Sequence, residues 1–381
     1  MKILFTIFTP PYAQGYLAHG GGGLSVEEKF LHYKDWFGVL RSALAVSHEV
    51  KLISLTKEPD VLSIWHDGYE SIFFPVLDAK VSVVDGRWDL DAQGVTEWVG
   101  AFYPDVIHII GSGQKLSLEI LQSSYASRCV LWERTKFKPE SHLQWDELRL
   151  CKRYILSTVE QQLEAGKYLA TEKLLSFPMG VNVDLFCPDS SVKDVDVFSV
   201  GRFWSAGKRL DIVFNLVKRN QLSWFIAGSV IKGWPYRWWE DLLFFSGPRR
   251  LLKLRRIKKA LFYPFTSGFF SNDKLPSLYN RAKVFVHPSK EEGASRAVNE
   301  ALACGIPVVV HKDGAPYIKP EFGVVCEGDQ EFETAVMGLL RDDKRREEMG
   351  RKGREWIMKN HSAKKLLDTV NILNADIIAD R

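Results

Sequence analysis

The sequence predicts an α/β protein built from two doubly wound domains. Short runs of apolar and β-branched residues alternate with longer stretches that suit helices. Such alternation is typical of βαβ units, in which helices cover both faces of a buried parallel sheet. The pattern restarts after Pro188, and a chain of 381 residues is long enough for two domains of ordinary size.

The elements follow one another in a regular order in both halves of the chain. Each short apolar run is expected to be a strand, and each longer stretch a helix. In the first half, strands are expected at residues 3–8, 50–55, 106–110, 129–132 and 154–157, with helices at 27–45, 116–122 and 160–169. In the second half, strands are expected at residues 195–200, 224–227, 284–287 and 308–311.

A stretch punctuated by proline and glycine separates the two halves. It runs from Phe177-Pro178-Met179-Gly180 to Cys187-Pro188-Asp189 and suits a linker. We therefore expect an N-terminal domain of residues 1–187 and a C-terminal domain of residues 188–364. A C-terminal helix at residues 365–381 is expected to complete the first domain.

The composition excludes several classes of protein. Hydrophobic residues make up 46% of the chain and charged residues 26%, which is typical of a water-soluble globular protein. The five cysteines are scattered and form no Cys-x-x-Cys pair, which favours a reducing, cytoplasmic compartment. The N-terminal apolar run is too short for a signal peptide. No stretch approaches the roughly 20 apolar residues that cross a bilayer.

The most informative segment is residues 284–309, which reads as strand, loop, short helix and strand. Ser295 suits the N-cap of the helix, and Gly305 suits the first position after it. Glu292 would then lie in the loop and Glu300 within the helix. Ligands of open α/β sheets bind beyond the carboxyl ends of strands, where a helix N-terminus accepts phosphate oxygens. A sugar nucleotide offers hydroxyls to both carboxylates and a diphosphate to the helix; the alternative is two surface glutamates on a structural helix.

This segment resembles the E-x7-E signature of the retaining GT-B glycosyltransferases of family 4, and the resemblance extends over almost the whole chain. No single match is specific, but six occur in the order of the family. Besides residues 292–300, the matching segments are residues 1–8 with 20–23, 48–50, 104–108, 178–182, and 199–203 with Lys208. The resemblance implies two Rossmann-like domains that face a central cleft. It also implies transfer of a hexosyl unit, with retention, from a nucleotide-diphosphate sugar to a hydroxyl acceptor.

The resemblance further implies roles for residues of the second domain. Arg202 and Lys208 would clamp the donor diphosphate, because fixed cations stabilise the charge that develops on the departing group. The spacing is one residue longer than usual, so Arg209 could replace Lys208, and solvated surface cations are the structural alternative. Glu300 would bind the ribose hydroxyls and Glu292 the donor sugar. The backbone groups expected near the donor belong to Gly293, Ala294 and Ser295.

In the first domain the resemblance implies a glycine loop and an acceptor-side group. Gly22 and Gly23 would let the backbone approach the phosphates closely, although a run of glycines can also be a plain flexible loop. The acceptor-side work would fall to His108 or to Glu133, which ends the strand at residues 129–132. The family often has a histidine two residues after His108, where this chain has Ile110. His108 could equally be a core histidine whose hydrogen bonds are satisfied.

No cofactor and no metal are expected beside the nucleotide sugar. Arginine, lysine and the helix dipole would meet the diphosphate charge instead. Asp89-Leu90-Asp91 and Asp194-Val195-Asp196 match Asp-x-Asp, but such triplets occur by chance, and the second leads directly into a strand. No enzymic nucleophile is assigned. The competing enzyme interpretation is a GT-B sugar-nucleotide epimerase or a phosphorylase.

Positive charge is concentrated in residues 231–260, which hold nine Lys or Arg and two Asp or Glu in a chain of net charge +4. Tryptophan and phenylalanine residues precede a cationic run with leucines at roughly helical spacing. This pattern predicts a helix on an anionic membrane surface, which would suit a lipid-linked glycan acceptor. The alternatives are an insertion packed on its own domain and, in another class, a basic membrane- or nucleic-acid-binding module. No RNA-binding signature is present, so we expect no nucleic-acid partner.

Overall fold

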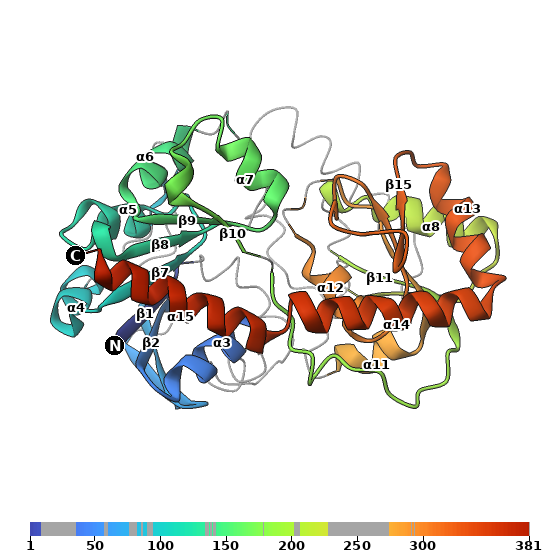
Figure 1. The fold of residues 1–381 in the computed structure, drawn as a ribbon, viewed down its shortest axis with the longest axis horizontal. Coiled ribbons are helices and arrows are strands. Elements are labelled where there is room, and N and C mark those ends of the chain that lie inside the picture. The colour runs from blue at the N-terminus through green and yellow to red at the C-terminus, as the bar shows by residue number, and fades with distance from the viewer. Residues whose placement is uncertain are drawn as a thin grey trace. The chain divides into compact units, whose positions relative to one another are not determined.

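The computed structural model describes residues 1–8, 36–56, 60–75, 82–84, 87–89, 94–133, 137, 139, 142–177, 179–201, 206–227, 274–290, 292 and 294–380. The chain divides into two compact units. The first unit contains Met1–Asn182 and Lys359–Arg381, and the second contains Val183–Met358. Each unit has a sheet and helices of its own, as Figure 1 shows.

The first unit is built around an eight-stranded sheet in the order β10-β9-β8-β7-β1-β2-β4-β3. All neighbours in it are parallel except β3 and β4. The strands are β1 (Lys2–Ile7), β2 (Glu49–Thr56), β3 (Leu62–His66), β4 (Tyr69–Pro75), β7 (Val106–Ile110), β8 (Cys129–Trp132), β9 (Arg153–Leu156) and β10 (Leu174–Ser176), with a separate pair β5 (Ser82–Val84) and β6 (Arg87–Asp89). The helices are α3 (Trp36–Ala45), α4 (Val95–Phe102), α5 (Lys115–Gln122), α6 (His142–Leu150), α7 (Val159–Ala165) and α15 (Ala363–Ala379).

Apolar side chains cover both faces of this sheet, as expected for buried parallel strands. On one face the core includes Leu366, Val370 and Leu373 from α15, packed with Leu40 of α3. The last helix of the chain therefore belongs to the first unit and lies beside α3 (Figure 1). The predicted helix at 365–381 corresponds to α15.

The division between the units falls after Asn182, five residues before the expected position. Phe177 is buried in the core of the first unit and donates its N–H to the carbonyl of Leu156 at 2.7 Å. Val181 donates its N–H to the carbonyl of His361 at 3.0 Å. These contacts hold the proline- and glycine-punctuated stretch on the first unit as far as Val181.

The second unit contains a five-stranded, fully parallel sheet in the order β12-β11-β13-β14-β15. Its strands are β11 (Val195–Val200), β12 (Trp224–Ala227), β13 (Ala282–His287), β14 (Val308–His311) and β15 (Gly323–Cys326). Its helices are α8 (Leu210–Arg219), α11 (Leu275–Asn280), α12 (Arg296–Ala303), α13 (Glu331–Leu340) and α14 (Asp343–Asn360). The four strands predicted for this half are present, and the sequence pattern missed β15.

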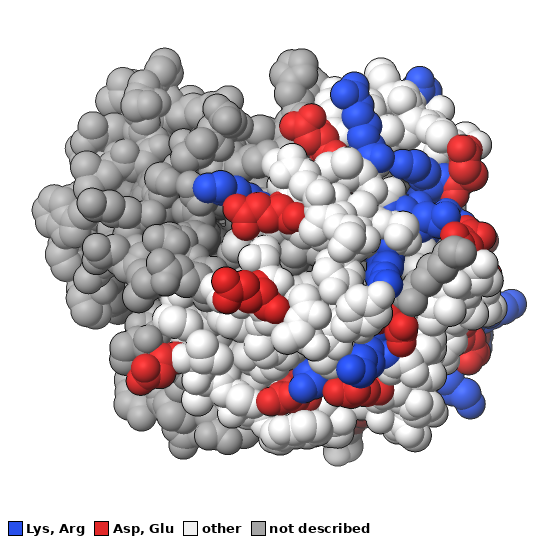
Figure 2. Space-filling model, turned by 90° about the vertical axis from the view of Figure 1, so that its left-hand side faces the viewer, with Lys and Arg blue, Asp and Glu red and all other residues white. Residues whose placement is uncertain are grey.

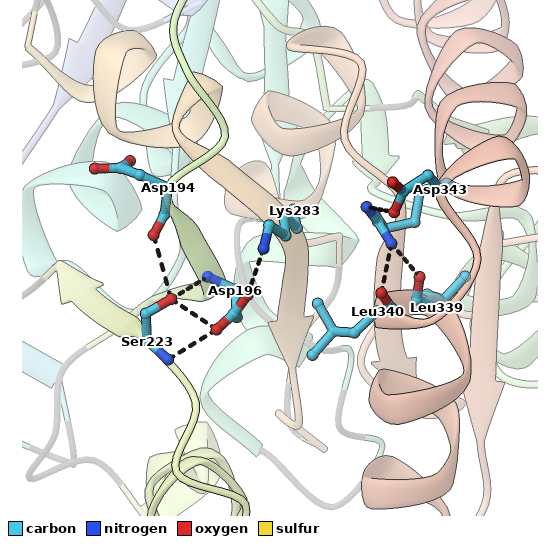
Figure 3. A network of polar contacts seen from close by, with 8 residues as sticks. Asp194, Asp196, Ser223, Lys283, Leu339, Leu340 and Asp343 are labelled. Atoms are coloured by element: carbon cyan, nitrogen blue, oxygen red, sulfur yellow. Dashed lines mark hydrogen bonds and ion pairs between the residues drawn. The ribbon is translucent and has the colours of Figure 1, made fainter.

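The second Asp-x-Asp triplet lies in a network of polar contacts where β11 and β13 begin (Figure 3). Asp196 accepts from Lys283 Nζ at 2.8 Å, and from the N–H and Oγ–H of Ser223 at 2.9 and 2.7 Å. Asp194 accepts two hydrogen bonds from the Arg281 guanidinium, at 2.8 and 2.6 Å. These carboxylates therefore join β13 and the turn before β12 to β11, at the edge of the sheet opposite the carboxyl ends of the strands.

Three buried histidines have pKa values lowered to about 4, because burial disfavours the imidazolium form: His108, His287 and His361. Between their ordinary pKa of 6.5 and about pH 4, the unfolded chain binds protons that the folded chain does not. Stability should therefore fall as the pH is lowered through this window, before most carboxylates titrate. Thermal unfolding followed at several pH values measures this. A melting temperature that stays constant from pH 6.5 to pH 4.5 would contradict it.

Within the described part of the chain, no helix is both long and apolar enough to cross a membrane. Figure 2 turns the left-hand side of Figure 1 toward the viewer, and on the described part of that face Lys and Arg side chains lie among Asp and Glu side chains. The expected basic amphipathic helix at 231–260 lies outside the described residues.

Candidate functional site

The predicted site segment leaves the sheet of the second unit at the carboxyl end of β13. His287 ends this strand, the chain then passes through Glu292, and α12 begins at Arg296. The carboxyl ends of β11 and β14 lie on either side, because these strands pair with β13 in parallel. Polar groups from three neighbouring segments can therefore meet at one edge of the sheet, where open α/β sheets bind their ligands.

Helix α12 begins and ends where the sequence predicted. Gly305 has a φ of +71° and donates its N–H to the carbonyl of Leu302 at 2.9 Å, while Ile306 donates to Ala301 at 3.0 Å. This is the Schellman pattern. Glycine is favoured at the position after the helix because, without a Cβ, it adopts a positive φ at little cost. Ser295 occupies the N-cap as expected, but its side chain makes no capping hydrogen bond. The N-cap position is therefore as predicted, and the Ser295 hydroxyl does not occupy the N–H groups at the start of the helix.

Glu292 forms an ion pair with Lys208, the candidate diphosphate clamp. It also accepts a hydrogen bond from Ser289 Oγ at 3.2 Å, and its Oε1 lies 3.7 Å from Nε2 of His287. Burial opposes ionisation of Glu292, but the neighbouring positive charges and these hydrogen bonds lower its pKa overall. Because burial lowers the pKa of His287 to about 4, Lys208 is the cation that balances Glu292 at neutral pH.

Glu300 lies within α12 and is almost completely buried. Tyr279 of α11 donates its hydroxyl to Glu300 Oε2 at 2.9 Å, and Arg296 Nε lies 3.3 Å from Oε1. Burial raises the pKa of Glu300, and Arg296 and the Tyr279 hydrogen bond act against that rise. Glu292 and Glu300 therefore have separate partners and different environments, which suits two different roles.

The structure separates the two candidate cations at 208 and 209. Lys208 pairs with Glu292 in the site segment, whereas Arg209 pairs with the exposed Asp329 after β15. Arg209 also donates to the carbonyl of Pro288 at 3.5 Å. The geometry thus favours Lys208 over Arg209 as the group directed at Glu292.

We expect Lys208→Met to lower sugar transfer by about 100-fold, as for loss of one preorganised charged group. Arg209→Met should lower it by less than about fivefold, because its partner Asp329 is about half exposed and lies outside the site segment, and surface ion pairs contribute up to about 1 kcal/mol. The two variants differ by one position and form a matched pair. Initial rates, with melting temperatures as a check on folding, measure the difference. A larger loss for Arg209→Met would reverse the assignment.

His108 lies in the core of the first unit, in the strand β7. Its Nδ1 accepts from Trp132 Nε1 at 3.0 Å, so its Nε2 is the nitrogen that donates to Asn374 Oδ1 at 2.9 Å. The ring also stacks on Phe5, with centroids 4.7 Å apart. Both ring nitrogens are engaged and no ring atom is exposed. The geometry favours the alternative that His108 is a core histidine over the acceptor-side role.

Glu133 follows β8 at the carboxyl end of the sheet in the first unit, and its side chain is buried. It accepts from Ser112 Oγ at 2.9 Å and from the Tyr154 hydroxyl at 3.1 Å. A second buried glutamate, Glu147 of α6, accepts from the N–H of Gly113 at 3.0 Å through each of its carboxylate oxygens. Both carboxylates thus hold the short loop that follows β7. No sequence pattern pointed to Glu147, because a helical stretch does not identify the distant N–H group from which its carboxylate accepts.

Several predicted site residues lie outside the described part of the chain. These are Gly22, Gly23, Arg202 and Gly293. Their roles remain predictions, as do those of Ala294, which is buried, and of Ser295. Among the described residues, no group of three or more His, Cys, Asp or Glu side chains could hold a metal ion.

Comparison with known proteins supports a glycosyltransferase. Residues 189–356, which make up almost all of the second unit, match the family model described as "Glycosyl transferases group 1". This part of the chain is therefore similar to that family. The match contains Lys208, Glu292 and Glu300.

Two curated relatives match shorter segments. "O-antigen chain mannosyltransferase B" of Escherichia coli is 30% identical over 115 residues, which cover 29% of this chain and 28% of that protein. A "GDP-mannose-dependent alpha-(1-6)-phosphatidylinositol monomannoside mannosyltransferase" of Mycolicibacterium smegmatis is 36% identical over 108 residues, which cover 25% of this chain and 28% of that protein. The similarity therefore spans less than a third of either relative.

Solved structures match the chain over its whole length. Sucrose-phosphate synthase from Thermosynechococcus elongatus has a TM-score of 0.70 at 15% identity, over 100% of this chain and 99% of the other. HepE from Anabaena, in complex with UDP, has a TM-score of 0.64 at 15% identity, over 99% of this chain and 100% of the other. At this identity the likeness concerns the fold alone. The predicted fold class is confirmed: the chain has the Rossmann-like, two-domain fold of GT-B glycosyltransferases.

Proposed function

We propose that this protein is a retaining glycosyltransferase of family 4, which moves a hexosyl unit from a nucleotide-diphosphate sugar to a hydroxyl acceptor in glycan assembly. The observation that carries the proposal is the placement of Glu292 and Glu300 in the second unit. Glu292 lies before α12 and forms an ion pair with Lys208, whereas Glu300 is buried within the helix. Because the two carboxylates have different partners, one can bind the sugar and the other the ribose.

The charges of the site suit a departing nucleoside diphosphate. Lys208 lies in the 3-10 turn before α8, and Arg202 precedes it in the sequence. Fixed cations and the N-terminus of α12 stabilise negative charge most where it develops, at the bridging phosphate oxygen. The acceptor proton would pass to the leaving phosphate. In this proposal arginine, lysine and the helix dipole take the place of a metal, so activity should survive excess EDTA.

The names of the curated relatives guide the choice of donor and acceptor. Both are called mannosyltransferases, one of O-antigen chains and the other GDP-mannose-dependent and acting on a phosphatidylinositol mannoside. We propose GDP-mannose as the first donor to test and a lipid-linked glycan as the acceptor class.

Residues 231–260, with their excess of basic residues, would hold the protein at the inner, anionic face of the membrane. Co-sedimentation with anionic vesicles but not neutral vesicles tests that attachment.

A panel of GDP-, UDP- and ADP-sugars, incubated with and without a glycan acceptor, tests the proposed function. We expect product only when acceptor is present, and the anomeric configuration of the donor should be kept, as read by NMR. Turnover without an acceptor would favour the epimerase interpretation. Sugar phosphate formed from a glycan and inorganic phosphate would favour a phosphorylase. An inverted product would remove the protein from the retaining family.

A further inference from the structure

An aromatic stack lies beside the site segment in the second unit. Tyr317 lies between β14 and β15, and its ring stacks on Trp356 of α14 with centroids 5.8 Å apart and an interplanar angle of 7°. Trp356 stacks in turn on Phe322, with centroids 5.0 Å apart. These two stacked contacts in series restrict the orientation of the Tyr317 ring.

The hydroxyl of Tyr317 points at the first turn of α12. It lies 2.8 Å from Oδ1 of Asn299 and 3.3 Å from the carbonyl oxygen of Ser295. Burial, together with the nearby charge of Glu292, raises the pKa of Tyr317 well above its ordinary value. The hydroxyl therefore keeps its proton throughout the physiological pH range. It can donate this proton to either of the two acceptors.

Both acceptors lie at the start of α12, between Glu292 and Glu300 in the sequence. The Ser295 carbonyl also accepts the N–H of Asn299 at 3.2 Å, so it closes the first turn of the helix. Asn299 is completely buried and directly precedes Glu300. The Ser295 side chain makes no capping hydrogen bond, and the Tyr317 hydroxyl contacts this turn from outside the helix.

We propose that Tyr317 is a positioning residue for the nucleotide sugar. It fixes the first turn of α12, so that the helix N–H groups and the Glu300 carboxylate are in place before the donor arrives. The inference rests on the proposed function and adds a residue to it that no motif contains. Rigid placement of binding groups raises affinity because less ordering is needed on binding.

Tyr317→Phe tests the inference, because phenylalanine keeps the stack on Trp356 and removes only the hydroxyl. A neutral hydrogen bond contributes about 1 kcal/mol, which corresponds to about a fivefold change. We expect the KM for the donor sugar, and the Kd for GDP or UDP measured by calorimetry, to rise about fivefold. The kcat should also fall, by no more than about fivefold, because the N–H groups of this turn face the charge that develops in the transition state.

A matched variant and a double variant separate positioning from general stability. Tyr103→Phe removes a hydroxyl that accepts from Arg128 on the surface of the first unit, and it should leave both constants unchanged. If the Tyr317 hydroxyl acts through Asn299, the effect of Tyr317→Phe should largely disappear in an Asn299→Ala background, since contacting residues are not additive.

Three outcomes distinguish whether Tyr317 positions the donor site. A rise in KM and Kd for Tyr317→Phe, in protein that stays folded at the assay temperature, supports the inference. Unchanged constants overturn it, and if Glu300→Ala abolishes binding in the same assay, the proposed function stands without it. A wild-type protein that binds neither GDP nor UDP overturns both the inference and the proposed function.

Discussion

Glu300→Ala should lower the rate of sugar transfer at least about 100-fold while leaving the protein folded. Glu300 is the buried carboxylate assigned to the ribose hydroxyls, and loss of one preorganised group at a reaction site typically has an effect of this size. Burial raises its pKa, so the ionised carboxylate is held at some cost in stability. Its removal should therefore leave the melting temperature nearly unchanged, and the partly exposed Arg296 can turn to solvent.

The matched control for this variant is Glu333→Ala in the same unit. Glu333 accepts from Arg219 and Asn220 at the surface, away from the site segment, and its removal should leave transfer unaffected. Initial rates with saturating acceptor, and melting temperatures of both variants, give the comparison. Near-normal transfer by a folded Glu300→Ala protein would remove Glu300 from the site.

Gly350→Ala should destabilise the second unit by about 3 kcal/mol or more. Gly350 lies in α14, where an added Cβ would come within 2.0 Å of the carbonyl oxygen of Gly305. The atom that the added Cβ meets is a backbone carbonyl oxygen, so no side chain can move aside, and overpacking of this kind is strongly unfavourable. Gly305 ends α12, and the strain would therefore reach the helix that carries Glu300.

Gly338→Ala is the matched control, because Gly338 also lies within a helix, α13, and a Cβ there meets nothing within 4 Å. Alanine in an open helical position should stabilise by roughly 0.5 to 1 kcal/mol. Denaturant unfolding should thus shift in opposite directions for the two variants. A stabilised Gly350→Ala protein would show that α14 does not pack on Gly305 as described.

The sequence alone predicted the doubly wound α/β class, most strands of both sheets and the limits of α12. These features depend on residues close together in the chain, such as the apolar run of β13 or the glycine at 305. Strand propensity and turn chemistry are local properties of the backbone. Strand β3 was not predicted because it alternates exposed and less exposed positions at the edge of the sheet, and its hairpin partner β4 was missed because the polar Glu70 and Ser71 lie near its start.

Only the tertiary structure decided which polar side chains meet. His108 finds its partner in Asn374, 266 residues further along the chain, and Lys208 meets Glu292 across 84 residues. Tyr317 reaches the first turn of α12 from a loop that carries no motif. Such pairings depend on the register of strands and on helices that return from distant sequence, which no local pattern records. The sequence therefore determined the scaffold and the positions of the two site glutamates, whereas long-range packing decided the environment of each.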